Sequence, residues 1–318
     1  MGTAPNTAME PGGIVNGQQI SRFRLMTYNI GGGKKDFSSQ PRNVAQVIEQ
    51  VSPDVLAVQE ASSYQDGDGE WHNFLTQMAQ AGDFGDNVHF APALSMQQDL
   101  DIRKPLFVHG LFNDWQDWIQ GNALLSRWAF VRLGDPSRAG TPRNVPLFRT
   151  PLYEGNRDTE PRYSLLSRIK TPDLAPFVVG VHLTTLVSER EREGGPRPLP
   201  GRLEDAQDLR IRQAKRLLTL LKEHVLARGK VVFLLGDFNA PASEPCISSV
   251  LVAEGGFTRL NPENEQNGTY PKVVEPIDHI LVHPGDRLVE YRCWIVDTPL
   301  ARKASDHLPV VADVTIAL

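Results

Sequence analysis

Six apolar runs in this 318-residue sequence start or end with side chains that could take part in hydrolytic or metal chemistry. The densest is LLGDFNAP at 234–241, where an acid and an amide flank a single phenylalanine. The complete set is Asn29, Glu60, His182, Asp237, Asn239, Asp278, Asp306 and His307. Turns favour asparagine, aspartate and histidine, so each residue alone has a structural explanation. Together, hard oxygen ligands and imidazoles are what a divalent-cation site with a general base requires, and we expect one shared site.

The spacing of Asp237 and Asn239 predicts that both side chains point to one side of a strand. Alternate residues of an extended strand share a face, so Phe238 would enter the core while the carboxylate and the amide stay together. An oxygen pair on a rigid strand end can hold a water molecule or a cation on one side of a cleft.

Short apolar runs with polar ends predict the strands that carry these residues. We expect strands at 23–30, 55–60, 122–133, 162–170, 177–185, 230–239, 277–284, 291–298 and 305–316. Apolar spacing typical of helices occurs within 44–51, 69–82 and 203–229, and Gly229 is expected to end the last helix. Strands mixed with a few helices and no central linker favour one α/β domain over 22–318, preceded by a flexible leader at 1–21.

Composition and charge argue against several classes of protein. The formal net charge is −5 and the sequence pI is about 5.9, so there is no global positive field to attract polyanions. Two cysteines, Cys246 and Cys293, cannot form a disulfide scaffold, although a single bridge stays open. No stretch approaches the roughly 18 apolar residues of a membrane span, and the N-terminus lacks the basic and apolar regions of a signal peptide. We expect a protein that is not transmembrane, either cytoplasmic or exported with a signal outside this sequence.

The polar strand ends occur in an ordered series of motifs that resembles a known family. The motifs MTYNI, VLAVQE, VVGVHLTT, LLGDFNAP, IDHILV and SDHLPVV resemble the signature of the endonuclease/exonuclease/phosphatase (DNase I-like) superfamily over about residues 23 to 316. The pairing of GDFN with a later SDHLP is the most specific part. The resemblance implies a four-layer α/β sandwich with two mixed sheets face to face, helices outside, and the site at the rim where strand ends meet.

The resemblance also implies a metal site. Glu60 matches the principal Mg²⁺ ligand of the family, Asn29 the amide that orients the metal or the phosphate, and Asp306 a second carboxylate on the metal side. Mn²⁺ or Ca²⁺ are expected substitutes for Mg²⁺.

Roles in catalysis carry over position by position. Asp237 matches the acid that positions and deprotonates the attacking water, and Asn239 the amide that binds a phosphate oxygen. His307 matches the imidazole that faces phosphorus, oriented and charged by Asp278 from behind. The expected phosphate contacts are His182, Arg162 and Thr185. The implied reaction is in-line displacement by water at phosphorus.

One departure bears on the role of His182. Relatives of the DNase I type pair this histidine with a glutamate near the strand that here contains Gln120, Gly121 and Asn122, where no acid stands. We therefore expect His182 to act as a neutral donor or phosphate ligand rather than as a general acid.

The substrate is left open by the sequence. A Mg²⁺-dependent phosphodiesterase acting on nucleic acid or a nucleotide-like diester is the first hypothesis, and a phosphatase or phospholipase C-type enzyme acting on a lipid or inositol phosphate head group is the alternative. A non-catalytic binding protein is disfavoured by the complete residue set. We expect a monomer without a stable protein partner.

Three further segments have two interpretations each. The aromatic stretch 107–118 could touch substrate or membrane, although packing over the sandwich edge is the favoured interpretation. Arginines in the loop 190–202 could contact a polyanion, but the interleaved glutamates of SEREREGG equally indicate a solvated loop. GGGKK at 31–35 does not fit a Walker-type phosphate loop, although its lysines could reach a phosphate.

Overall fold

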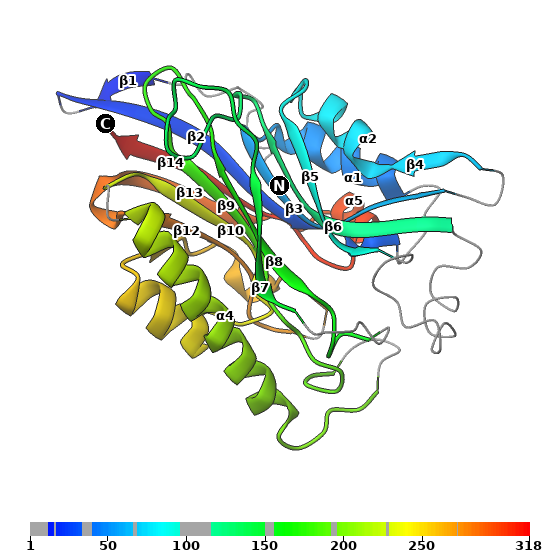
Figure 1. The fold of residues 1–318 in the computed structure, drawn as a ribbon. Helices are drawn as coiled ribbons and strands as arrows, with labels where there is room; N and C mark the ends of the chain where they lie inside the picture. Colours follow the sequence, from blue (N-terminus) through cyan, green and yellow to red (C-terminus); the bar gives the residue numbers. More distant parts are fainter. Residues whose placement is uncertain are drawn as a thin grey trace.

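Two β-sheets packed face to face, with helices on the outer surfaces, form the protein (Figure 1). The structure is a computed structural model, and it describes residues 12–15, 17–33, 40–65, 69–95, 116–149, 156–191, 196–226, 229–271 and 273–318. This arrangement confirms the predicted four-layer α/β sandwich with two mixed sheets.

The first sheet has eight strands in the order β13-β14-β2-β3-β6-β5, with β1 paired to β2 and β4 paired to β3. Its strands are β1 (Gly12–Val15), β2 (Gln18–Asn29), β3 (Val55–Gln65), β4 (Trp71–Asn73), β5 (Val88–Ser95), β6 (Gln116–Ser126), β13 (Leu288–Ile295) and β14 (Val310–Ala317). Strands β2 and β3 are parallel, and the other pairs are antiparallel.

The second sheet has six strands in the order β11-β12-β10-β9-β8-β7. They are β7 (Arg143–Phe148), β8 (Arg162–Arg168), β9 (Phe177–His182), β10 (Val232–Asp237), β11 (Thr258–Arg259) and β12 (Asp278–His283). Only β9 and β10 run parallel, so the carboxyl ends of these two neighbours reach the same edge.

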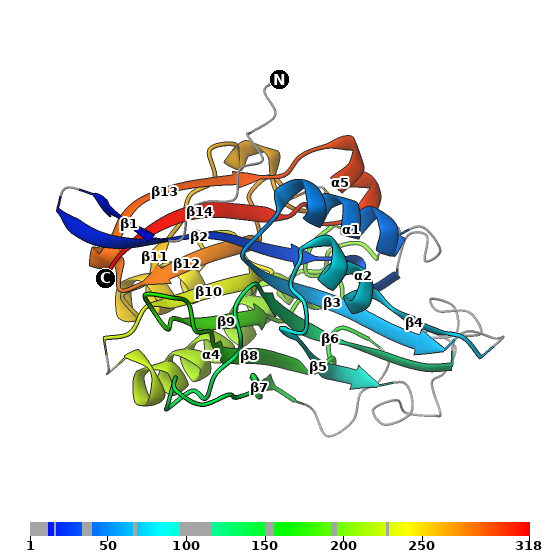
Figure 2. The ribbon, with the colours of Figure 1, turned by 90° about the horizontal axis from the view of Figure 1, so that it is seen from above.

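Helices cover the outer face of each sheet (Figure 2). On the first sheet lie α1 (Gln40–Val51), α2 (Phe74–Ala81) and α5 (Pro299–Ala304), and on the second lie α4 (Arg202–His224) and a π-helix at Cys246–Glu254. Short 3-10 turns occur at Gly31–Gly33, Glu265–Asn267 and Gly285–Arg287. The buried face of α1 carries Val44, Val47, Ile48 and Val51, the residues whose spacing predicts that helix.

Aromatic residues join the two sheets across the central core. The ring of Phe23 on β2 lies 5.0 Å from that of Phe233 on β10 and 5.5 Å from that of Trp128, measured between centroids. Strands β9 and β10 are buried along their whole length because one face meets the first sheet and the other meets α4 and the π-helix. This explains why both strands are continuous apolar runs rather than alternating ones.

The predicted elements are present, with differences in extent: the strand expected at 122–133 runs over Gln116–Ser126, and the one expected at 305–316 begins at Val310. Strand β3 continues past Glu60 to Gln65, and the helix predicted to end at Gly229 ends at His224. Trp71–Asn73, expected in a helix, pairs with β3 as β4, and Asn73 caps α2 instead. Gly12–Val15 and Gln18–Ser21, assigned to a leader, pair with each other as β1 and the start of β2.

Two of the open questions from the sequence concern cysteines and membranes. Cys246 and Cys293 are free thiols buried at separate places in the core, so they do not form a bridge. Among the described residues, no helix has the length and apolar character needed to cross a bilayer.

Candidate active site

The predicted site residues meet at one rim of the sandwich, where strands of both sheets end. Asn29 is the last residue of β2, and His182 and Asp237 are the last residues of the parallel neighbours β9 and β10. Asp237 is in register with His182 on one side and with Asp278, the first residue of β12, on the other. Sheet pairing alone therefore places three of the functional side chains in one row, and the first sheet brings Asn29 to them.

Asp237 lies at the centre of this group. Its Oδ2 accepts a hydrogen bond from Asn29 Nδ2 at 3.0 Å and lies 3.5 Å from His182 Nε2 and 3.8 Å from His307 Nε2. Its Oδ1 accepts from the backbone N–H of Asn239 at 2.8 Å. The carboxylate is thus held on both oxygens and faces two imidazoles.

Glycine at position 236 allows this row to form. A Cβ added to Gly236 would lie 2.1 Å from the carbonyl oxygen of Val181 on the neighbouring strand, which no side chain tolerates. The glycine that interrupts the apolar run before Asp237 therefore serves close approach of β9 and β10 at the site end.

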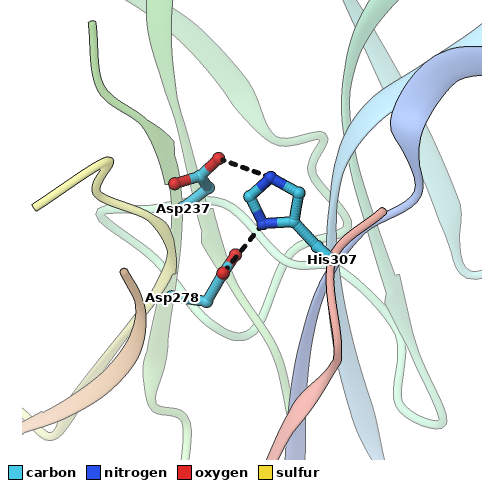
Figure 3. A group of neighbouring side chains, drawn as sticks. All are labelled: Asp237, Asp278 and His307. Atoms are coloured by element: carbon cyan, nitrogen blue, oxygen red, sulfur yellow. Dashed lines mark hydrogen bonds and ion pairs between the residues drawn. The ribbon is translucent and has the colours of Figure 1, made fainter. Parts of the chain in front are cut away.

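His307 and Asp278 form a buried pair directed at Asp237 (Figure 3). His307 Nδ1 lies 2.9 Å from Asp278 Oδ2, and its other nitrogen faces Asp237. Desolvation lowers the pKa of His307, but the carboxylates of Asp278 and Asp237 outweigh it and raise this pKa to about 9. Burial raises the pKa of Asp278 to about 6. At neutral pH the pair is therefore a carboxylate and an imidazolium, which agrees with the predicted orienting role of Asp278.

Asp237 remains ionised despite its burial. Desolvation opposes the charge, yet the imidazolium of His307 and the donors from Asn29 and Asn239 hold the pKa of Asp237 below its usual value. An ionised carboxylate that faces two imidazoles is suited to accept a proton from a water molecule.

The residues predicted to hold a metal lie beside this cluster. Asn29 Nδ2 also donates to Glu60 Oε1 at 3.2 Å, and Ser305 Oγ, which donates to the Asn29 backbone carbonyl, approaches Asp306 Oδ1 at 3.4 Å. Glu60 and Asp306 are both half-buried, so their oxygens are accessible from the rim. Glu60 has a positive φ of 55° inside a bulge of β3, between the paired residues Val58 and Ala61, and this bulge turns its side chain to the rim.

The carboxylates of Glu60 and Asp306 fit a hard divalent cation, because oxygen atoms are the ligands that Mg²⁺ prefers. Asn29 presents Nδ2 to Glu60, while its Oδ1, the atom that could bind a cation, accepts from the Gly31 N–H at 3.0 Å. Asp237, Asp278 and His307 also have potential ligand atoms within 4.8 Å of one another. Without a cation, one oxygen of Asp278 is bonded to His307 Nδ1, and the neighbouring carboxylates favour the imidazolium form of His307. The cluster can therefore serve proton transfer and charge stabilisation.

His182 lies between a cation, Arg162, and the carboxylate of Asp237. Arg162 Nη1 lies 3.0 Å from one ring nitrogen and 2.9 Å from the other, and Arg162 Nη2 donates to Glu160 at 3.0 Å. Burial first, and the Arg162 charge second, lower the pKa of His182 to about 3. His182 is therefore neutral at physiological pH, which supports its predicted role as a neutral donor.

Arg162 is 3% exposed, and its Nε has no hydrogen-bond partner. A buried guanidinium N–H without an acceptor at the edge of the site is a feature that a bound oxyanion would satisfy. Glu60, Gln120, Asn122 and His182 line the small cavity beside Arg162, with no acid from the strand of Gln120 and Asn122.

The prediction that Asp237 and Asn239 share the face of one strand is wrong. Strand β10 ends at Asp237, and Asn239 has a left-handed backbone with φ of 50°. The Asn239 side chain reaches back across the parallel strand end, where Nδ2 donates to the Leu183 carbonyl at 3.1 Å. Phe238 is fully buried, as expected. The amide thus stays near the site through a turn and not through strand alternation.

Thr185 is also buried, 3% exposed, in the segment that follows β9. Its predicted phosphate contact stays a prediction. Arg190 and Arg202 of the same loop bond to the protein itself: Arg190 to Glu189 and the Asn239 carbonyl, and Arg202 to Asp158 and the Val187 carbonyl. Two interpretations were open for these arginines, contact with a polyanion and a solvated loop; the structure shows both side chains bonded within the protein. Arg192, Lys34, Lys35 and nearly all of the aromatic stretch 107–118 lie outside the described residues.

Sequence reasoning missed four residues that support the site. The Tyr270 ring lies 4.8 Å from the His307 ring, and Thr269 Oγ1 accepts from the backbone N–H of Asp278 at 3.3 Å. Ser305 Oγ accepts from the His307 N–H at 3.2 Å, and Glu160 pairs with Arg162. Of these, only Ser305 had a usable signal, since serine two residues before a turn residue commonly caps its backbone.

Comparisons with known proteins identify the family. The model of the Endonuclease/Exonuclease/phosphatase family matches residues 26–307. A search of curated proteins finds no match.

Solved structures share the fold. An endonuclease/exonuclease/phosphatase from Beutenbergia cavernae DSM 12333 has a TM-score of 0.62 and 22% identity, covering 93% of this chain and 72% of that one. The human Nocturnin catalytic domain with bound sulfate has a TM-score of 0.60 and 17% identity, and the match covers 93% of this chain and 95% of that domain. A mannosyl-6-phosphatase from Bacteroides thetaiotaomicron VPI-5482 has a TM-score of 0.54 and 16% identity, and the match covers 92% of this chain and 99% of that one.

These identities are low enough that the solved structures establish the fold alone. The family model covers most of the chain, from β2 to the histidine of the site. The chain therefore belongs to the endonuclease/exonuclease/phosphatase family, whose members hydrolyse phosphoesters.

Proposed function

We propose that this protein is a Mg²⁺-dependent phosphodiesterase that cleaves its substrate by in-line attack of water at phosphorus. The observation that carries the proposal is the buried His307–Asp278 pair, 2.9 Å apart, directed at an ionised Asp237 on the rim. Such a group supplies a proton acceptor and a fixed positive charge next to each other at the rim.

Charge balance supports a requirement for a divalent cation. Among the described residues, the site and its immediate partners hold an excess of carboxylates over cations. The carboxylates are Glu60, Asp237, Asp278, Asp306 and Glu160, and the cations are His307 and Arg162. An anionic phosphate would be repelled by this excess. Glu60, Asn29 and Asp306 would hold Mg²⁺, which, when bound, neutralises charge on the phosphoryl and leaving oxygens.

The residues of the chain divide the remaining work. Asp237 accepts the proton of the attacking water, because its pKa is held low and one of its oxygens faces the space beside His307. The His307 imidazolium, with Nε2 directed into the site and Nδ1 bonded to Asp278, stabilises negative charge that develops on the phosphoryl oxygens. Asn239, neutral His182 and Arg162 bind phosphate oxygens and orient the ester.

A singly charged diester suits this site better than a doubly charged monoester. The carboxylate excess exceeds the charge of a single Mg²⁺ ion, so each additional negative charge on the substrate weakens binding. One structural neighbour is a mannosyl-6-phosphatase, which keeps the monoester and head-group alternative in the test.

The test is a hydrolysis panel in Mg²⁺, with an EDTA control and the His307→Ala variant. The panel holds supercoiled plasmid, abasic duplex, single-stranded RNA, sphingomyelin vesicles, an inositol polyphosphate, and the paired synthetic substrates bis-p-nitrophenyl phosphate and p-nitrophenyl phosphate. We expect cleavage of a diester that both EDTA and His307→Ala abolish. Faster turnover of p-nitrophenyl phosphate than of its diester would reject the diesterase assignment, and hydrolysis that survives in His307→Ala would reject the site.

A further inference from the structure

A buried ion cluster lies behind the site, between α4 and the loops that follow β9 and β10. Arg210 of α4 is fully buried, and its guanidinium forms a fork with Glu244, Nε to Oε1 at 2.6 Å and Nη2 to Oε2 at 2.9 Å. Its remaining nitrogen, Nη1, donates to Glu189 Oε2 at 3.0 Å and to the Thr184 carbonyl at 3.1 Å. One arginine therefore joins the helix to both loops.

Glu189 connects Arg210 to Arg190, which lies closer to the site. Its Oε2 accepts from the backbone N–H of Leu186 at 2.8 Å, and its Oε1 accepts from Arg190 Nε at 2.7 Å. Arg190 in turn donates through Nη2 to the backbone carbonyl of Asn239. Asn239 is the amide proposed to bind a phosphate oxygen, so the chain of contacts runs from α4 to a substrate ligand.

A second set of contacts fixes the other side of the same loop. Gln213, one turn after Arg210 on α4, accepts from the Thr184 N–H at 3.0 Å and donates to the Thr184 hydroxyl. Leu183, the residue before Thr184, has the backbone carbonyl that accepts from the side-chain amide of Asn239. The loop that begins at His182 is thus held by α4 and holds Asn239 in turn.

The geometry of Asn239 needs such support. A left-handed backbone at a residue other than glycine persists only where its surroundings determine it, and such conformations concentrate at functional sites. Asn239 is held by Asp237 at its N–H, by Arg190 at its carbonyl and by Leu183 at its side chain. Of these three hydrogen bonds, those with Asp237 and Leu183 come from the ends of β10 and β9, whereas the one with Arg190 comes from the loop further along the chain.

Stability alone does not account for the cluster. Two arginines and two glutamates with little or no exposure have been removed from water, and buried ion pairs are often no more stabilising than apolar residues of the same volume. What the ions provide here is orientation: Arg210, Glu189 and Arg190 each bond a backbone group of a site loop, and Glu244 fixes the guanidinium of Arg210.

We propose that the cluster of Arg210, Glu189, Glu244 and Arg190 positions Asn239 for phosphate binding, with Arg190 as the final positioning residue. This inference rests on the proposed function, because it concerns the same phosphate site. Neither arginine touches the substrate; both act through the Asn239 backbone. Loss of Arg190 leaves the amide present but displaced.

The test compares Arg190→Met and Arg190→Lys with Arg202→Met as the matched control. Arg202 belongs to the same loop region but bonds Asp158 and Val187, away from Asn239. For the diester that the wild type hydrolyses, we expect Arg190→Met to raise KM by about tenfold, the order of one charged hydrogen bond, with kcat changed less than about threefold. Arg190→Lys keeps the positive charge but cannot donate to Glu189 and to the Asn239 carbonyl from two separate nitrogens. It is less prone to a folding defect than Arg190→Met, and we expect its KM to rise as well.

A double mutant separates positioning from a merely structural role. Arg190→Met combined with Asn239→Ala should have the KM of Asn239→Ala alone, because Arg190 acts only through that amide. Additive losses, or a wild-type KM in Arg190→Met and Arg190→Lys, would overturn the inference while leaving the proposed function intact. A wild-type KM in Asn239→Ala would overturn both the phosphate role of Asn239 and the inference that depends on it.

Hydrogen–deuterium exchange provides a readout that needs no turnover. Backbone amides of 237–245 should exchange faster in Arg190→Met than in the wild type or Arg202→Met, at equal melting temperature or after correction for it. If no substrate of the panel is hydrolysed, the proposed function fails, and exchange alone decides the positioning role. Unchanged exchange in this segment would overturn it.

Discussion

Replacing Asp278 by asparagine tests the central pair of the site. The two side chains have nearly the same shape, so the amide oxygen in Asp278→Asn can still accept from His307 Nδ1, but the negative charge is lost. That charge is the main reason why the pKa of His307 is raised from 6.5 to about 9. A difference of this size corresponds to about 3 kcal/mol of preference for the imidazolium. Without the Asp278 carboxylate, Asp237 and Asp306 still oppose desolvation, but the pKa of His307 falls and a smaller fraction of His307 is protonated at the assay pH.

The expected result is a fall in kcat of about two to three orders of magnitude with KM nearly unchanged, since the lost charge acts mainly in the transition state. The stability cost should be modest, because His307 can lose its proton and does not remain as an unpaired buried cation. Bis-p-nitrophenyl phosphate in Mg²⁺ is a suitable substrate, and thermal unfolding checks that both proteins fold.

The pH dependence of activity is an independent test of the protonation state of His307. Activity requires protonated His307, so the activity of the wild type falls as the pH rises through the pKa of that imidazole. Bound Mg²⁺ beside Asp306 would move this alkaline limb of the pH profile to lower pH. In Asp278→Asn the limb should move further to acid pH, and ¹⁵N titration of the imidazole should show the same shift. A kcat within about threefold of the wild type, or an unmoved limb, would refute the reasoning.

Three further predictions concern acid stability, metal binding and strand packing. His279 is fully buried and neutral, with its pKa lowered to about 3 by burial and by Arg259, so the stability it contributes is complete above pH 6.5 and falls by about 1 kcal/mol per pH unit below it. His279→Gln, which can keep bonds to Arg259 and the Ala240 carbonyl, should flatten this slope in urea unfolding between pH 6.5 and 4.5; an unchanged slope would exclude His279 as its source. Glu60→Gln should weaken Mg²⁺ activation by about 10- to 100-fold in metal titrations, because a charged ligand becomes neutral; the same half-saturating Mg²⁺ as the wild type would remove Glu60 from the metal site. Gly236→Ala should lower the free energy of unfolding by about 3 kcal/mol, because its Cβ would lie 2.1 Å from a carbonyl of β9, and a melting temperature equal to the wild type would contradict that close contact.

The sequence was sufficient for the fold class and for most of the site's membership. Apolar runs with polar ends are a local signal, and the runs before Asn29, His182 and Asp237 are strands that end at these residues in the structure. The ordered motifs then selected one family, which the family model confirms over residues 26–307.

Backbone geometry at the site was not predictable in the same way. The expectation for Asn239 assumed an extended strand, but pairing with β9 and β12 ends at Asp237, and the chain turns where it has no further partner. Likewise Glu60 was placed at a strand end, whereas it occupies a bulge inside β3, set by the register against β6. Register depends on a second strand far away in the sequence, so local patterns carry no information about it.

Partners across the fold show the same division. By itself the sequence determined which side chains are available, where apolar strands end, and that none of Gln120, Gly121 and Asn122 is an acid. Only the tertiary structure decided that His182 faces Arg162, that Asp278 reaches His307, and that Arg210 joins both loops to α4. Charge and hydrogen-bond capacity belong to single residues, whereas pKa, orientation and burial arise from neighbours that the folded sheets bring together.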